Sequence, residues 1–231
     1  MLKPHQFHIS PIQASQSSLF KQLLKFVLVG LVFFGFTVNA ASLYVAGSEV
    51  PIPVQIVESQ TEILMEQLSS RKDEFDENPQ ALIYFARHVA LSHWDLKKAS
   101  RLMLGKHWTK ADSKQRDRFE EEFLRTLLRY VVRAYGFYDD SFVKILSYAW
   151  QPKKRGGWVH SVIQLPAGLK VSVDYRMNLD EKKQWKLIDV RVEGISLVSS
   201  KRTEYRQMIS KEGLEALLKT MYVKNQKVLA G

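Results

Sequence analysis

The sequence predicts an α+β fold in which helices pack on one side of a four-stranded antiparallel sheet. Two patterns along the 231 residues support this prediction. Between residues 54 and 135, apolar side chains recur with the period of an α-helix, whereas between 142 and 198 they alternate with a period of two. The segments with alternating side chains are separated by short turns, which favours antiparallel pairing of neighbouring strands.

The first 40 residues have the order of a secretory signal peptide. They contain three lysines and no Asp or Glu, then an apolar run over 26–36, then Val38 and Ala40 at the −3 and −1 positions of a cleavage site. We therefore expect a signal peptide over 1–40, a tether over 41–53 and a single domain over 54–231, located outside the cytoplasm. In the alternative interpretation, residues 26–46 stay in place as a membrane anchor, because 21 residues can span a bilayer.

The helical half of the domain is predicted from periodicity and from helix start and stop signals. A first helix is expected over 54–68. Asn78 and Pro79 form an N-cap and first-turn pair that opens a second helix, and Gly105 ends a third helix over 96–104. The clearest helix covers 113–135, where Asp112 and Gln115 resemble a capping box and apolar residues keep the 3.6 period for more than four turns. Two further helices are expected over 201–209 and 213–222.

The second half predicts four strands, over 142–150, 158–165, 169–179 and 185–198. The turns between them are rich in Gly, Pro or charged residues. Alternation places Val171, Val173 and Tyr175 on one face of the third strand, and Ile188, Val190 and Val192 on one face of the fourth. The apolar face of such a sheet must be covered, either by the long helix or by curling around a pocket.

The composition excludes several classes of site. The chain has no cysteine, which rules out disulfides, thiolate metal sites and a cysteine nucleophile. Nucleotide-binding and hydrolase motifs are absent, and the few histidines lack the spacing of a metal site. We therefore expect no catalytic residue, no metal and no cofactor.

Carboxylates in the strands leave one enzymatic alternative open. A buried Asp174 or Asp189, together with Tyr135 or Tyr175, could abstract a proton from a substrate in a pocket. The other interpretation is that Asp174 and Asp189 pair with Arg176 or Arg191 across strands, and that Asp139 and Asp140 form a turn.

The formal charge of the chain is +10 and falls to +7 when the three leader lysines are removed. An exported chain is a poor nucleic-acid partner, and no motif for base stacking is evident. A membrane surface or an acidic phosphate headgroup is the more suitable partner.

Several segments resemble the MlaC family, also called Ttg2D or toluene tolerance proteins. They are Arg101-Leu102-Met103-Leu104-Gly105-Lys106-His107-Trp108, Val173-Asp174-Tyr175-Arg176 and Trp185-Lys186-Leu187-Ile188-Asp189-Val190 with the following Val192–Val198. The match runs in order from about residue 82 to 218. His93-Trp94-Asp95 departs from the usual pattern of the family.

The resemblance implies a periplasmic phospholipid carrier with an NTF2-like fold, in which a curved sheet wrapped by helices encloses an apolar pocket. It implies that the protein carries phospholipid as cargo between two complexes, an outer-membrane lipoprotein–porin complex and an inner-membrane ABC transporter with an MCE-domain ring. This transport would maintain the lipid asymmetry of the outer membrane. The alternatives are an NTF2-like isomerase that acts on an apolar substrate and an envelope scaffold without ligand.

We expect the lipid pocket to lie between the inner face of the sheet and the long helix. The expected lining residues are Val171, Val173, Tyr175, Ile188, Val190, Val192 and Ile195 on the sheet, and Leu124, Leu127, Leu128, Val131 and Tyr135 on the helix.

Overall fold

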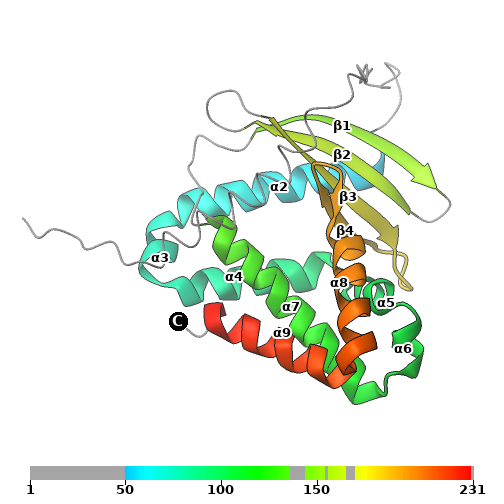
Figure 1. Ribbon diagram of the computed structural model, residues 1–231. Helices are drawn as coiled ribbons and strands as arrows, with labels where there is room; N and C mark the ends of the chain where they lie inside the picture. Colours follow the sequence, from blue (N-terminus) through cyan, green and yellow to red (C-terminus); the bar gives the residue numbers. More distant parts are fainter. Residues whose placement is uncertain (1–49, 136–143, 154–155, 165–169, 230–231) are drawn as a thin grey trace, which may run out of the picture. The chain divides into compact units, whose positions relative to one another are not determined.

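The fold is described from a computed structural model, which covers residues 50–135, 144–153, 156–164 and 170–229 (Figure 1). The chain divides into two compact units, 1–41 and 42–231, and all described residues belong to the second. The predicted signal peptide lies outside the described residues, as do most of the predicted tether and the Asp139–Asp140 pair.

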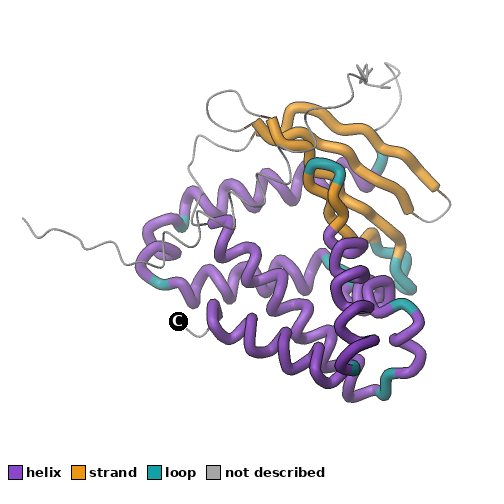
Figure 2. Tube along the Cα trace, in the orientation of Figure 1, coloured by secondary structure: helices purple, strands orange, loops and turns teal. Residues whose placement is uncertain are grey.

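Helices precede and follow an antiparallel sheet, which confirms the predicted α+β class (Figures 1 and 2). The described helices are α2 Ile52–Ser70, α3 Lys72–Glu77, α4 Pro79–His93, α5 Leu96–Leu104, α6 Lys106–Lys110, α7 Ser113–Tyr135, α8 Leu197–Glu212 and α9 Leu214–Leu229. The strands are β1 Lys144–Lys153, β2 Gly156–Gln164, β3 Lys170–Leu179, β4 Trp185–Val192 and β5 Ile195–Ser196.

The sheet is a meander with the order β1-β2-β3-β4-β5, in which each strand pairs antiparallel with the next. The fourth predicted strand is shorter than expected. It ends at Val192, because Glu193 and Gly194 adopt positive φ values of 49° and 77° and reverse the chain. The predicted strand residues 197 and 198 instead form the first turn of α8.

Local capping explains where several helices begin. The Asn78 side chain accepts hydrogen bonds from the first-turn amides of α4. Asp112 and Gln115 exchange hydrogen bonds in the predicted capping box: Gln115 N donates to Asp112 Oδ1 at 2.8 Å and Asp112 N donates to Gln115 Oε1 at 3.2 Å. These side chains satisfy amide groups that have no partner within the helix.

The helices form a layer with its own core. The largest cluster of buried side chains joins α5, α6, α7, α8 and α9 around Phe119 and Phe123. A second cluster packs Ala86 and Ala90 of α4 against Leu124 and Leu128 of α7. The long helix therefore packs mainly against other helices.

The helix that covers the sheet is α2. Its first two turns place Val54 and Val57 against Val159 of β2 and Met177 of β3. Its last turns pack Leu64, Met65 and Leu68 among α3 and α4 residues, including Phe75 and Leu82. Thus α2 contacts the sheet with one end and the helical layer with the other (Figure 1).

The outer edge of β4 is also occupied along part of its length. Trp94 forms a parallel bridge with Leu187, and Asp95 N donates a hydrogen bond to Leu187 O at 2.9 Å. β5 continues this edge at Arg191 and Val192. Within the described part of the chain, no helix combines the length and the apolarity needed to cross a membrane.

Candidate functional site

The predicted sheet residues largely share one face. In the register, Val173 pairs with Ser161 and Val192, and Tyr175 pairs with Val159 and Val190. Directly paired residues point to the same side of a sheet, so this face also carries Val171, by alternation along β3, and Ile195, which pairs with Val192. It is the face that α2 covers through Val159 and Met177.

Ile188 does not follow the alternation expected for β4. The register shifts opposite Arg176 and Met177, so that Arg176 pairs with Asp189 whereas Met177 pairs with Leu187. Ile188 is the extra residue of this irregularity, as in a β-bulge, and it is buried. Leu187 takes the position facing α2 that strict alternation would give to Ile188.

The exposure of the predicted sheet residues rises toward the β4–β5 turn. Val173 is buried and Tyr175 is partly buried. At the other end, Val192 is 45% exposed and Ile195 is 51% exposed. This side of the sheet therefore presents two branched apolar side chains to solvent next to the start of α8.

Polar groups also lie between the sheet and α2. Ser161 Oγ donates to Val173 O at 2.6 Å. Burial raises the pKa of the Tyr175 phenol, and hydrogen bonds with Ser161 and Thr61 offset part of the rise. Val54, Val57 and Thr61 of α2 were not predicted as neighbours of this face. The spacing of the two valines was nevertheless a signal for an apolar helix face.

The predicted helix residues lie in a different environment. Leu124, Leu127 and Leu128 are buried against other helices, whereas Val131 is 38% exposed. The Tyr135 hydroxyl donates to Asp76 Oδ1 at 2.9 Å. Among the described residues, no single cluster of buried side chains unites the helix group with the sheet group.

Asp189 is buried and caps the helix that follows it. Its carboxylate accepts hydrogen bonds from Ser196 Oγ at 2.6 Å and from Val198 N at 3.0 Å. Ser196 Oγ in turn accepts from Ser199 N. A carboxylate in this position satisfies first-turn amides and complements the positive end of the helix, so Asp189 joins β4 to α8.

Asp174 is likewise fully engaged. Its two oxygens lie 2.9 Å from His160 Nδ1 and 2.6 Å from Arg191 Nε, so the expected pairing of Asp174 with Arg191 is confirmed. The three residues sit directly opposite one another on β2, β3 and β4. Alternation places them on the face opposite to Val173 and Tyr175. Both carboxylates of the enzymatic alternative thus have structural partners.

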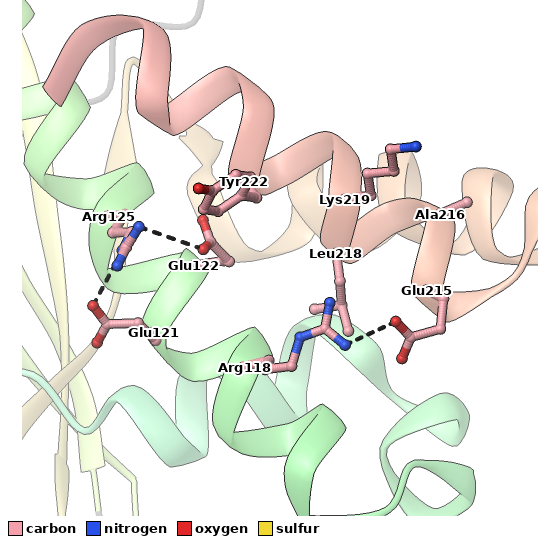
Figure 3. A pocket seen from close by; sticks show the side chains of 9 residues that line it. All are labelled: Arg118, Glu121, Glu122, Arg125, Glu215, Ala216, Leu218, Lys219 and Tyr222. Carbon is pink, nitrogen blue, oxygen red and sulfur yellow. Dashed lines mark hydrogen bonds and ion pairs between the residues drawn. The ribbon is translucent and has the colours of Figure 1, made fainter. Parts of the chain in front are cut away.

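Two surface grooves stand out in the described part of the chain, and neither is lined by a predicted pocket residue. One, of about 610 Å³, lies between α7 and α9 (Figure 3) and is lined by Arg118, Glu121, Glu122, Arg125, Glu215, Ala216, Leu218, Lys219 and Tyr222. The other, of about 400 Å³, is formed by α5, α6 and α8 and is lined by Lys98, Arg101, Leu102, Gly105, Trp108, Thr109 and Arg202.

The charges of the α7–α9 groove largely compensate one another. Arg118 pairs with Glu215 at 2.8 Å, and Arg125 lies 3.2 Å from Glu121 and 3.8 Å from Glu122 (Figure 3). Beneath them, the fully buried Asn225 donates to Glu122 Oε2 at 2.8 Å and accepts from Thr126 Oγ1. These contacts fix α9 on α7 and leave little unbalanced charge for a ligand.

In the described ranges, no group of three or more His, Cys, Asp or Glu side chains is placed to hold a metal ion.

The sheet and its neighbours together offer an apolar face with exposed apolar residues at one end. The buried carboxylates Asp174 and Asp189 serve structural roles.

Comparison with known proteins gives two findings. A family model described as MlaC protein matches residues 58–222. The fold is similar to the structure of a phospholipid-binding protein from Ralstonia solanacearum in complex with a phospholipid, with a TM-score of 0.67 and 20% sequence identity, over 77% of this chain and 98% of that one. No curated protein matches the chain.

Proposed function

We propose, on the premise that this chain belongs to the MlaC family, that it binds phospholipid and carries it through the periplasm. The observation that carries the proposal is the family match over 58–222. The similar fold of the Ralstonia solanacearum protein, which was solved with a phospholipid, gives further support.

The physical chemistry of the cargo explains what such a carrier must supply. Each CH₂ group moved from an apolar environment into water costs about 0.8 kcal/mol. Two acyl chains of about fifteen carbons therefore cost on the order of 20 kcal/mol or more in water, which a carrier must offset with apolar contacts. The sheet face that bears Val171, Val173, Val190 and Val192 supplies surface of this kind.

The predicted pocket remains our proposal for where the acyl chains lie, and α2 is added as one of its borders. One wall is a sheet face. The first turns of α2 border this face, where Val54 packs against it. The residues of the wall are Val171, Val173, Tyr175, Val190, Val192 and Ile195. Among the predicted pocket residues, Val131, Val192 and Ile195 are exposed. Bound acyl chains would therefore remove more apolar surface from water at these three residues than at the others.

We further propose the route that the family resemblance implies. The carrier would exchange phospholipid between an outer-membrane lipoprotein–porin complex and an inner-membrane ABC transporter with an MCE-domain ring, and thereby maintain outer-membrane lipid asymmetry. A leader over 1–40 would deliver the chain to the periplasm.

Native mass spectrometry of the purified protein, with organic extraction of bound material, tests the binding function. We expect near-stoichiometric phospholipid on the wild-type protein. An apo mass that takes up no lipid from phospholipid vesicles would contradict the proposal.

Ile195→Glu tests the location of the acyl chains, because Ile195 is exposed and the variant should fold. We expect it to lose most of the bound lipid, since a carboxylate cannot be buried against acyl chains without a large cost. Leu91→Glu, at an exposed apolar position of α4, is the matched control and should keep its lipid. Wild-type lipid occupancy in Ile195→Glu would place the chains elsewhere.

A further inference from the structure

A lysine lies on the inward-facing side of α8. Leu197, Lys201 and Tyr205 follow one another at intervals of four residues and therefore share a helix face. Leu197 and Tyr205 belong to the helical core, and the Lys201 side chain is only 19% exposed. Lysine is rarely placed in this way unless its charge has partners.

The partners of Lys201 come from α7 and α8. Its Nζ lies 2.6 Å from Glu204 Oε2 and 5.7 Å from the centre of the Tyr205 ring. Burial alone would lower the pKa of Lys201, but Tyr130 and Glu204 favour the ammonium form, so the pKa lies above its ordinary value. Lys201 is therefore a cation at neutral pH.

Arg129 brings a second cation to Tyr130. Its guanidinium lies 5.2 Å from the centre of the Tyr130 ring. Burial raises the pKa of the Tyr205 phenol, and the nearby charge of Arg129 offsets a small part of that rise. Arg129 Nε is buried and has no hydrogen-bond partner among the described residues. One turn earlier, Arg125 is paired with two glutamates, whereas no ion pair with a described residue is found for Arg129.

The contacts found here include three cations and one carboxylate. Lys201 and Lys224 approach Glu204 to 2.6 and 3.8 Å, and Arg129 lies against the ring of Tyr130, which is also a partner of Lys201. A buried N–H without an acceptor carries a desolvation cost that an anionic acceptor would remove. Guanidinium groups match the oxygens of a phosphate particularly well.

We propose that Arg129 and Lys201, together with the Tyr130 hydroxyl, bind the phosphate of the lipid cargo at the junction of α7 and α8. This inference rests on the proposed function and adds to it a contact with the headgroup. The same helix carries the exposed Val131, and α8 begins directly after the exposed Ile195. Apolar positions proposed for the acyl chains thus lie close in sequence to the phosphate site.

Lipid loading of the full mature protein tests the proposal. The wild-type protein and the variants Arg129→Gln and Lys201→Gln are incubated with vesicles that contain either phosphatidylglycerol or diacylglycerol with the same acyl chains, and bound lipid is measured by native mass spectrometry. We expect the wild-type protein to take up phospholipid at least about tenfold better than diacylglycerol, since diacylglycerol has no phosphate to accept charge-assisted hydrogen bonds. Each variant should lose most of this preference while its uptake of diacylglycerol stays unchanged.

Two controls separate a phosphate contact from a general effect on folding. Arg133→Gln removes an exposed arginine of the same helix and should leave the preference intact. Lys201→Arg keeps the charge and should restore it. Equal uptake of the two lipids by the wild-type protein, or an unchanged preference in both glutamine variants, would overturn the phosphate site while leaving the carrier function standing. A wild-type protein that takes up neither lipid would contradict the proposed function itself.

Inorganic phosphate distinguishes a site for the cargo from a site for the free ion. We expect millimolar phosphate to reduce uptake of phosphatidylglycerol and to leave uptake of diacylglycerol unaffected. Phosphate that binds to the wild-type protein, but not to Arg129→Gln, without reducing phospholipid uptake would show that the site serves the free ion, and would overturn the assignment.

Discussion

The helical layer and the inner face of the sheet differ in how completely the chain's own side chains fill them. The helical core contains aromatic residues with no exposure, Phe119 and Phe123, which pack edge-on against Tyr205 and Trp94. Between α2 and the sheet, the buried cluster consists of Val54, Val57, Val159 and Met177. Toward β5 the same sheet face ends in exposed side chains. This difference agrees with our proposal that the helices provide stability and that the sheet face contacts the lipid.

Truncation in the helical core should produce the largest loss of stability. Phe119→Ala removes a fully buried ring and its contact with Tyr205, and we expect a decrease of about 4 kcal/mol in the free energy of unfolding, measured by urea denaturation. Ile195→Ala, on the sheet face, should cost less than about 1 kcal/mol. Similar costs for the two variants would contradict the division between the regions.

Asp189, which joins β4 of the sheet to α8 of the helical layer, should give an intermediate loss of stability. Asp189→Ala leaves the Ser196 hydroxyl and the Val198 amide without their acceptor, and we expect a loss of about 2 kcal/mol. Asp180→Ala, which removes an exposed turn carboxylate that accepts from Gln184 N, serves as the control and should cost less than half as much. Equal losses would mean that Asp189 does not anchor α8.

The smallest effect is expected at the surface of the helical layer. Burial acts to raise the pKa of Glu121, but hydrogen bonds from Arg87 and Arg125 outweigh it, and the pKa lies below its ordinary value. Because the folded-state pKa is lowered, the stabilising contribution is present above the ordinary glutamate pKa of about 4.3 and is lost as the pH falls through the folded-state value.

Glu121→Gln should therefore reduce stability slightly at pH 7, by less than about 1 kcal/mol because the pair is substantially exposed. The difference from the wild-type protein should disappear in acid, as followed by thermal melting between about pH 3 and pH 7. A stability difference between the variant and the wild-type protein that grows as the pH falls would contradict the predicted pH dependence.

Sequence periodicity predicted the helical layer well because its signals are local. The bounds of the helices over 96–104 and 113–135 are confirmed, as are the Asn78 cap and the stop at Gly105. The short α3 and α6 and the reversal at Glu193 and Gly194 were missed. A five- or six-residue helix has little periodicity, and an apolar residue on either side of a tight turn resembles a continuing strand.

The site was harder to predict because it depends on contacts between distant segments. Alternation correctly grouped Val171, Val173 and Tyr175, yet it cannot reveal an extra residue such as Ile188, which shifts the register. The assignment of α7 as the cover of the sheet followed from its strong periodicity, but that apolar stripe packs against other helices. The weaker stripe of α2 covers the sheet, and its partners lie more than a hundred residues further along the chain.

The attachment of α2 to the sheet also has a consequence for the order of assembly. The contact of Val54 with Met177 closes a loop of more than a hundred residues, whereas each hairpin of the sheet closes over a short loop and loses less chain entropy. We therefore expect the contact between α2 and the sheet to form later than the hairpins.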